Sequence, residues 1–182
     1  MNTAEKIRHL KLIIDTVDVT QPRASWFYRE PLVGEVAIPK GAVVEILGNR
    51  KYEWFIQFLK QNPEIKTFWA EKEQHVLPTA LQQRGLNLDQ ITFGVFGEDS
   101  YLSLRKVIQS QVFDVIISPN VFKELKLLRA FQLMTEKSNN TLFLVGQKTP
   151  SNAWPISLQL DISKKGKGLE IEILKQRYGV ST

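Results

Sequence analysis

The chain has 182 residues, of which 43% are hydrophobic and 24% charged, and its formal net charge is +5. This length and composition predict one soluble globular domain with a full core, and no apolar run approaches the roughly 18–20 residues that cross a bilayer. The sequence contains no cysteine, which excludes disulfides and thiol-bound metals and is typical of a reducing compartment. We therefore expect a cytoplasmic protein that has no membrane contact.

The first part of the chain predicts a helix followed by a connection. Apolar residues recur at helical spacing within residues 3–15, which indicates an amphipathic helix. Residues 18–41 contain three prolines and show no helical period, which indicates an irregular segment. We accordingly divide the chain into an N-terminal helix and connection, residues 1–37, and a core domain, residues 38–182.

The core alternates between predicted strands and predicted helices. Continuous apolar runs, typical of strands buried on both faces of a sheet, lie at residues 42–47, 67–70, 91–96, 113–118 and 141–146. Segments with helical period lie between them, at residues 50–61, 76–84, 100–110 and 121–138. This alternation predicts an α/β fold with a mostly parallel central sheet flanked by helices.

The last part of the core follows another pattern. Residues 156–163 and 169–177 alternate between apolar and polar side chains, and the turn-forming stretch KKGKG joins them. Such alternation is typical of an antiparallel hairpin with one solvated face. We expect this C-terminal hairpin at the edge of the sheet.

The first core strand ends like the entry to a phosphate-binding loop. In the sequence VVEILGNRKYEWF the strand runs into Gly48, but the pattern G-x-x-x-x-G-K-[ST] then places Glu53, Trp54 and Phe55 at the second glycine, the lysine and the hydroxyl. That lysine holds the nucleotide phosphates and that hydroxyl binds Mg²⁺, and aromatic rings do neither. We expect Trp54 and Phe55 to fill the vacated pocket; an exposed anchor for a partner is the alternative.

Several segments in order resemble the RecA ATPase core, over about residues 38–177. They are IPKGAVVEILG, WAEKEQHVLPTALQQRGLNLDQITFGVF, LRKVIQSQVFDVIIS, KSNNTLFLVGQ and the closing strands up to LEIEILKQR. The resemblance implies a RecA-like sheet. It does not extend to the long loop that contacts single-stranded DNA in RecA, since KTPSNAW is too short.

The resemblance also indicates which residues of this chain occupy the catalytic positions of the RecA family. Ser118 stands where the family has its second metal-side carboxylate. Glu73 stands at the place of the water-activating glutamate and Gln147 at that of the phosphate sensor, and both could equally be surface residues. Lys175 and Arg177 match the basic pair that reaches a neighbouring subunit's nucleotide, or they are solvated charge. The expectation is a catalytically degenerate branch that has no catalytic residue, cofactor or metal.

Two families keep a RecA-like core without its ATPase: the ImuA proteins of damage-induced mutagenesis and the SulA division inhibitors. The stretch KELKLLRAFQLMTEKSNNTLFLVG and the C-terminal hairpin resemble ImuA. This resemblance implies a non-catalytic protein of the SOS response to DNA damage that binds RecA or a translesion polymerase assembly. The partner-binding candidates are Ile7, Leu10, Ile14, Lys175 and Arg177.

Other functions stay open. One is a SulA-like inhibitor of cell division that binds FtsZ. Another is a recombination protein that binds nucleotide weakly, with Glu73 as base and Lys51 or Arg50 in place of the missing lysine. Direct DNA binding is a third, because the predicted helix 121–138 carries charge that could form a basic face; the candidates are Lys123, Lys126 and Arg129. The two histidines, His9 and His75, lie far apart and predict no metal site.

Overall fold

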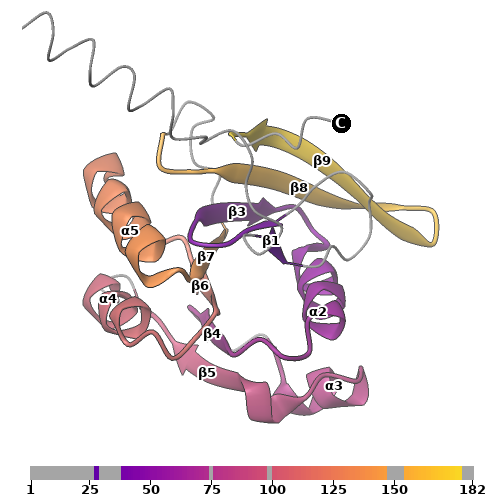
Figure 1. The fold of residues 1–182 in the computed structure, drawn as a ribbon. Helices are drawn as coiled ribbons and strands as arrows, with labels where there is room; N and C mark the ends of the chain where they lie inside the picture. Colours follow the sequence, from indigo (N-terminus) through magenta and orange to yellow (C-terminus); the bar gives the residue numbers. More distant parts are fainter. Residues whose placement is uncertain (1–26, 29–37, 74–75, 98–99, 147–153, 178–182) are drawn as a thin grey trace, which may run out of the picture.

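The computed structural model describes residues 27–28, 38–73, 76–97, 100–146 and 154–177. In this part of the chain seven strands form one sheet in the order β5-β4-β6-β7-β3-β8-β9, with helices on both faces (Figure 1). Six neighbouring strands are parallel, from β5 to β8, and β9 is antiparallel to β8. The predicted α/β class with a mostly parallel sheet and a C-terminal hairpin is confirmed.

The elements follow the sequence pattern closely. The strands of the sheet are β3 (Val43–Leu47), β4 (Thr67–Glu71), β5 (Ile91–Val95), β6 (Val115–Pro119), β7 (Thr141–Val145), β8 (Leu158–Lys165) and β9 (Gly168–Gln176). The helices are α2 (Lys51–Gln61), α3 (Pro78–Gln83), the 3-10 turn η2 (Leu88–Gln90), α4 (Tyr101–Gln109) and α5 (Leu125–Ser138).

Two hydrophobic clusters bury the two faces of the sheet. On the first face, Trp54 and Phe58 of α2 pack with Phe143 of β7. On the second face, Leu104 of α4 and Phe131 of α5 join the other core cluster. We call these the α2 face, which α2 and α3 cover, and the α5 face, which α4 and α5 cover. Because both faces are covered, the central strands are mostly apolar, as in other parallel sheets, with a few buried polar residues such as Glu45 and Ser118.

Two details of burial differ from the sequence prediction. The run at 91–96 predicts a strand buried on both faces, but β5 lies at the edge and Val95 is 67% exposed. The alternation at 156–163 predicts a solvated face for this strand of the edge hairpin, but β8 pairs in parallel with β3 and its Gln159 is buried. Only β9 is the edge of this hairpin. The position of a strand in the sheet depends on its neighbours, which local periodicity does not encode.

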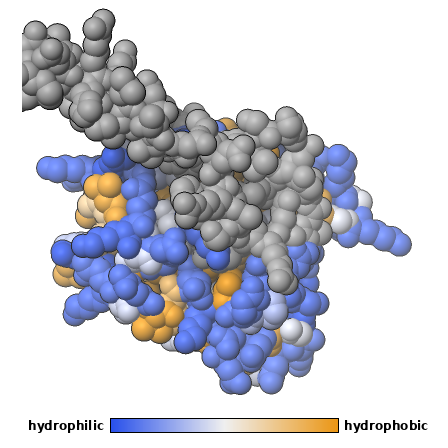
Figure 2. All heavy atoms as spheres, viewed as in Figure 1, coloured by the Kyte–Doolittle hydropathy of each residue, from blue (hydrophilic) through white to orange (hydrophobic). Residues whose placement is uncertain are grey.

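The surface of the helical layer carries exposed leucines. The apolar residues of the predicted helix 121–138 include Leu125 and Leu133, yet both are about half exposed in α5, whereas Gln132 and Thr135 are buried. The view in Figure 2 shows hydrophobic side chains at the surface where α4 and α5 lie, surrounded by hydrophilic ones.

A short strand pair stands apart from the main sheet. β1 (Phe27–Tyr28) pairs antiparallel with β2 (Ile38–Pro39). This pairing joins a piece of the expected connection to the start of the expected core domain. The predicted helix within residues 3–15, with Ile7, Leu10 and Ile14, lies outside the described residues, so the division at residues 37 and 38 stays a prediction.

Candidate functional site

A pocket opens where the parallel strands end. Its volume is about 710 Å³, and it is lined by the last residues of β4, β6 and β7 together with the first turn of α2 and residues 120–123 before α5. The helix after β4 lies on the α2 face and the helix after β6 lies on the α5 face. Because β4 and β6 are neighbours, the pocket lies at a topological switch point, where α/β sheets bind ligands.

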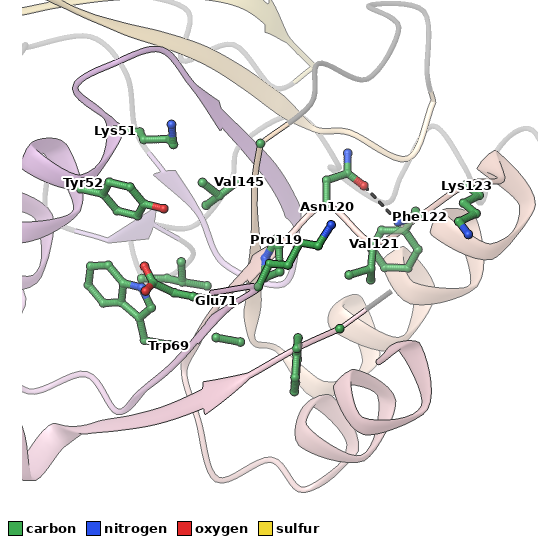
Figure 3. Close-up of a pocket in the computed structure, with 16 residues that line it drawn as sticks. Lys51, Tyr52, Trp69, Glu71, Pro119, Asn120, Val121, Phe122, Lys123 and Val145 are labelled. Atoms are coloured by element: carbon green, nitrogen blue, oxygen red, sulfur yellow. Dashed lines mark hydrogen bonds between the residues drawn. The ribbon is translucent and has the colours of Figure 1, made fainter. Parts of the chain in front are cut away.

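The pocket brings a carboxylate, an indole and a phenol together. Glu71, at the end of β4, is 9% exposed, and its Oε2 accepts the backbone N–H of Val76 at 2.9 Å. Tyr52 stacks on Trp69 with ring centroids 6.3 Å apart. Burial raises the pKa of the Tyr52 hydroxyl, and the negative charge of Glu71 raises it further. In Figure 3 these three side chains gather on one side of the pocket, opposite Asn120 and Lys123.

The lining can hold polar and anionic groups. Trp69 is 1% exposed, and its Nε1 has no hydrogen-bond partner within the described ranges. Three lysines from different segments also line the pocket, Lys51, Lys72 and Lys123. The indole N–H donates only, and the lysines carry positive charge, so these lining groups suit an acceptor.

The connection from β3 to α2 is a tight turn. Only Gly48, Asn49 and Arg50 separate the end of β3 from Lys51, the first residue of α2. Gly48 has φ +90°, and a Cβ at this position would overlap the carbonyl group of Ile162 in β8. The backbone N–H of Arg50 donates to that same carbonyl oxygen at 3.2 Å. The glycine is therefore required by the close approach of β8.

The aromatic residues that follow belong to the core. Trp54 and Phe55 are 1% and 0% exposed. Trp54 stacks on Phe58 with centroids 5.2 Å apart, and the rings of Phe55 and Phe143 meet edge to face at 5.4 Å. These rings lie between α2 and the sheet, and the pocket at the strand ends is lined by Lys51 and Tyr52 instead. The expectation that Trp54 and Phe55 fill a vacated phosphate pocket needs this correction, because the helix turns them toward the core.

A buried polar row crosses the sheet next to the pocket. Glu45 of β3 and Gln159 of β8 are paired in register and are both at most 1% exposed. Gln159 Nε2 donates to Glu45 Oε2, and Asn120 Nδ2 donates to Glu45 Oε1 at 3.3 Å. Lys175 of β9 continues the row, since it pairs with Gln159. The sequence indicates only one member of this row, Glu45, because it is a charged residue within the apolar run VVEIL. Nothing in the sequence indicates its partners.

A cluster of cations surrounds an exposed tryptophan on the α5 side. Trp154 is 56% exposed. The guanidinium of Arg177 lies 3.5 Å from the centre of its ring, and that of Arg129 from α5 lies 5.7 Å away. Lys175 is near enough to Arg177 that their charges interact. We call Arg129, Trp154, Lys175 and Arg177 the Trp154 cluster.

The comparisons with known proteins concern the fold. The chain is similar to the crystal structure of the RadB recombinase, with a TM-score of 0.53 and 16% sequence identity, over 77% of this chain and 83% of that chain. The fold is RecA-like. No protein-family model and no curated protein matches the sequence.

The RecA-like fold places the positions singled out from the sequence. Ser118 is fully buried, and its hydroxyl donates to the carbonyl of Pro119 at 3.0 Å. Glu73 is exposed and does not line the pocket, whereas Glu71, two residues earlier, does. Gln147 lies outside the described residues. Of the DNA-binding candidates, Lys123 lines the pocket, Lys126 is exposed, and only Arg129 belongs to the Trp154 cluster.

A RecA-like fold raises the question of a magnesium-bound nucleotide, and the described residues do not fit one. The turn of Gly48, Asn49 and Arg50 leaves no loop to surround phosphates, and the lysine and hydroxyl positions are core aromatics. No group of three or more histidine, aspartate or glutamate side chains suited to a metal occurs in the part of the chain that the structure describes. In the same part, no helix has the length and apolar character needed to cross a membrane.

Proposed function

We propose that this protein is a non-catalytic RecA-like protein of the SOS response to DNA damage, ImuA-like, that acts by binding RecA or a translesion polymerase assembly. The observation that carries the proposal is the closed turn between β3 and α2, where Trp54 and Phe55 belong to the core. A phosphate grip needs backbone N–H groups in an open loop, a lysine and a hydroxyl. Without these groups, we infer that the protein functions through its surface, by binding a partner.

The surface candidates agree with a binding role. Lys175 and Arg177 match the pair that the RecA resemblance assigns to contacts between subunits, and Arg177 stacks on an exposed tryptophan. Arginine and tryptophan are over-represented among the residues that contribute most to protein interfaces. The other candidates, Ile7, Leu10 and Ile14, belong to the part of the chain that is not described, so their role is proposed from the sequence alone.

The test is equilibrium binding of the purified protein to RecA, with FtsZ measured in parallel on the same surface. We expect RecA to bind, and we expect the double variant Lys175→Glu/Arg177→Glu to weaken binding by about tenfold or more. Lys167→Glu is the matched control, because Lys167 is exposed at the opposite end of the same hairpin. Binding to FtsZ alone would replace the proposal by the SulA-like alternative.

Weak nucleotide binding is a second candidate, favoured by the pocket at the strand ends with its lysines. Thermal unfolding with and without saturating Mg-ATP distinguishes nucleotide binding from the non-catalytic function proposed first. A ligand that binds only the native state raises the melting temperature by mass action. We expect no shift in the melting temperature. A reproducible rise would support nucleotide binding. Loss of that rise in Lys51→Ala would place the nucleotide in this pocket.

A further inference from the structure

We infer that the Trp154 cluster is the contact site of this protein and that it receives an acidic segment of the partner protein. The inference rests on the proposed function for the existence of a protein partner. It specifies the chemistry of that partner. It also adds Trp154 and Arg129 to the contact site, which the sequence analysis had not done.

The first support is the way the cluster is assembled. Its members come from three separate segments: Arg129 from α5, Trp154 from the approach to β8, and Lys175 and Arg177 from β9 and the residue after it. The backbone N–H of Arg177 donates to Ser157 at 2.8 Å, which ties this end of the hairpin to the residues that follow Trp154. Arg129 Nη1 donates to Gln132 Oε1 at 2.7 Å. The two guanidinium groups thus reach a single ring from separate elements.

The second support is charge. Two guanidinium groups lie at one ring, and the positive charge of Lys175 interacts with that of Arg177. Glu45, whose negative charge also acts on Lys175, is fully buried beneath the surface. Like charges held together repel one another, so an anion that docks among them relieves the repulsion. Arginine suits carboxylates in particular, because its planar guanidinium makes two parallel hydrogen bonds to them.

The third support is the exposed indole. More than half of Trp154 faces solvent while Arg177 covers its ring closely. A guanidinium stacked on an aromatic face is held in place and loses less rotamer freedom when it binds. Tryptophan beside arginine is also the composition of strong interface contacts. An acidic segment with neighbouring apolar residues would engage both the cations and the indole.

A single-stranded nucleic acid is the competing polyanion, and the geometry favours it less. Sites for single strands combine a basic groove with open aromatic faces on which bases stack. Here Arg177 already lies over the ring of Trp154, and the basic residues gather around one point. Lys123 and Lys126, which would extend a basic track, lie outside the cluster.

The experiment measures RecA binding by the wild type and by Arg129→Glu, Trp154→Ala and Arg177→Lys. Lys126→Glu is the matched control, because it makes the same change of charge at an exposed position of the same helix. We expect Arg129→Glu and Trp154→Ala to weaken binding by about tenfold, Arg177→Lys to weaken it although the charge is kept, and Lys126→Glu to change it by about twofold or less. Poly-L-glutamate should compete with RecA, and a poly-dT oligonucleotide should not.

The outcomes separate this inference from the proposed function. If RecA binds and all cluster variants bind like the wild type, the inference is wrong and the proposed function stands. If RecA does not bind, direct titration with poly-L-glutamate decides: binding that Arg129→Glu weakens keeps the acidic-segment site for another partner, and its absence removes the site. Competition by poly-dT that is lost in the cluster variants would overturn the acidic segment in favour of nucleic acid. Unchanged thermal unfolding of each variant ensures that lost binding is not lost folding.

Discussion

Gly48 and Ile162 lie so close together that a side chain on the first would overlap the backbone of the second. The glycine that ends β3 therefore has a purely structural reason to be there. Its φ of +90° lies in the region that residues with a Cβ rarely adopt. A residue that looks like the remains of a phosphate loop is explained by the packing of the turn against β8.

Gly48→Ala should be strongly destabilising. The left-handed backbone costs a residue with a Cβ about 1–2 kcal/mol, and the overlap with Ile162 adds about 1–3 kcal/mol of overpacking. We expect a loss of about 2–5 kcal/mol in the free energy of unfolding, measured by urea denaturation. Gly97→Ala is the control, because no atom lies within 4 Å of its added Cβ. Equal stability of the two variants would show that the turn between β3 and α2 can accommodate a Cβ at position 48, which would contradict the prediction.

Trp54→Ala should lower the free energy of unfolding by about 3–5 kcal/mol, since it opens a large cavity between α2 and the sheet. The exposed Trp154→Ala should cost about 1 kcal/mol or less. The effects on RecA binding should be reversed. Trp154→Ala should bind RecA more weakly than the wild type does, and Trp54→Ala should bind it normally under conditions where this variant stays folded. Loss of RecA binding by folded Trp54→Ala would instead mean that binding requires the packing of α2 on the sheet, because Trp54 itself is 1% exposed.

Glu45 and Gln159 should be energetically coupled. Removal of the buried carboxylate takes away the acceptor of one hydrogen bond from the Gln159 amide and one from the Asn120 amide, so Glu45→Ala should cost about 3 kcal/mol. A double-mutant cycle with Gln159→Ala should give a coupling of about 0.5–3 kcal/mol. Simple addition of the two single losses would mean that the hydrogen bond between them contributes nothing to stability.

The titration of Lys175 should be visible in stability. Burial lowers the pKa of Lys175, the charge of Arg177 lowers it further, and Glu45 opposes this. The unfolded chain therefore binds this proton more tightly than the folded one, so stability rises as the pH rises through the depressed folded pKa toward the unfolded value. As the pH is raised toward the unfolded value of about 10.4, the melting temperature of the wild type should rise relative to that of Lys175→Met. A constant difference across this range would contradict the assignment.

The sequence by itself determined the elements and their order. Strand and helix periods are local properties, so the runs at 67–70 and 141–146 and the hairpin with its KKGKG turn could be recognised from a few residues each. Their succession predicted the α/β class, and the resemblance of these segments to the RecA core implied the RecA-like fold. The loss of the lysine and the hydroxyl after Gly48 was equally visible, because it depends only on residue identity.

Only the tertiary structure decided where those elements meet. The edge position of β5, the burial of Gln159 in β8 and the turning of Trp54 toward the core all depend on which strands become neighbours. The Trp154 cluster draws on three segments far apart in the sequence, and Glu71 reaches the pocket while Glu73 does not. Contacts between distant segments have no local period, so the candidate sites appear only when the sheet order brings their residues together.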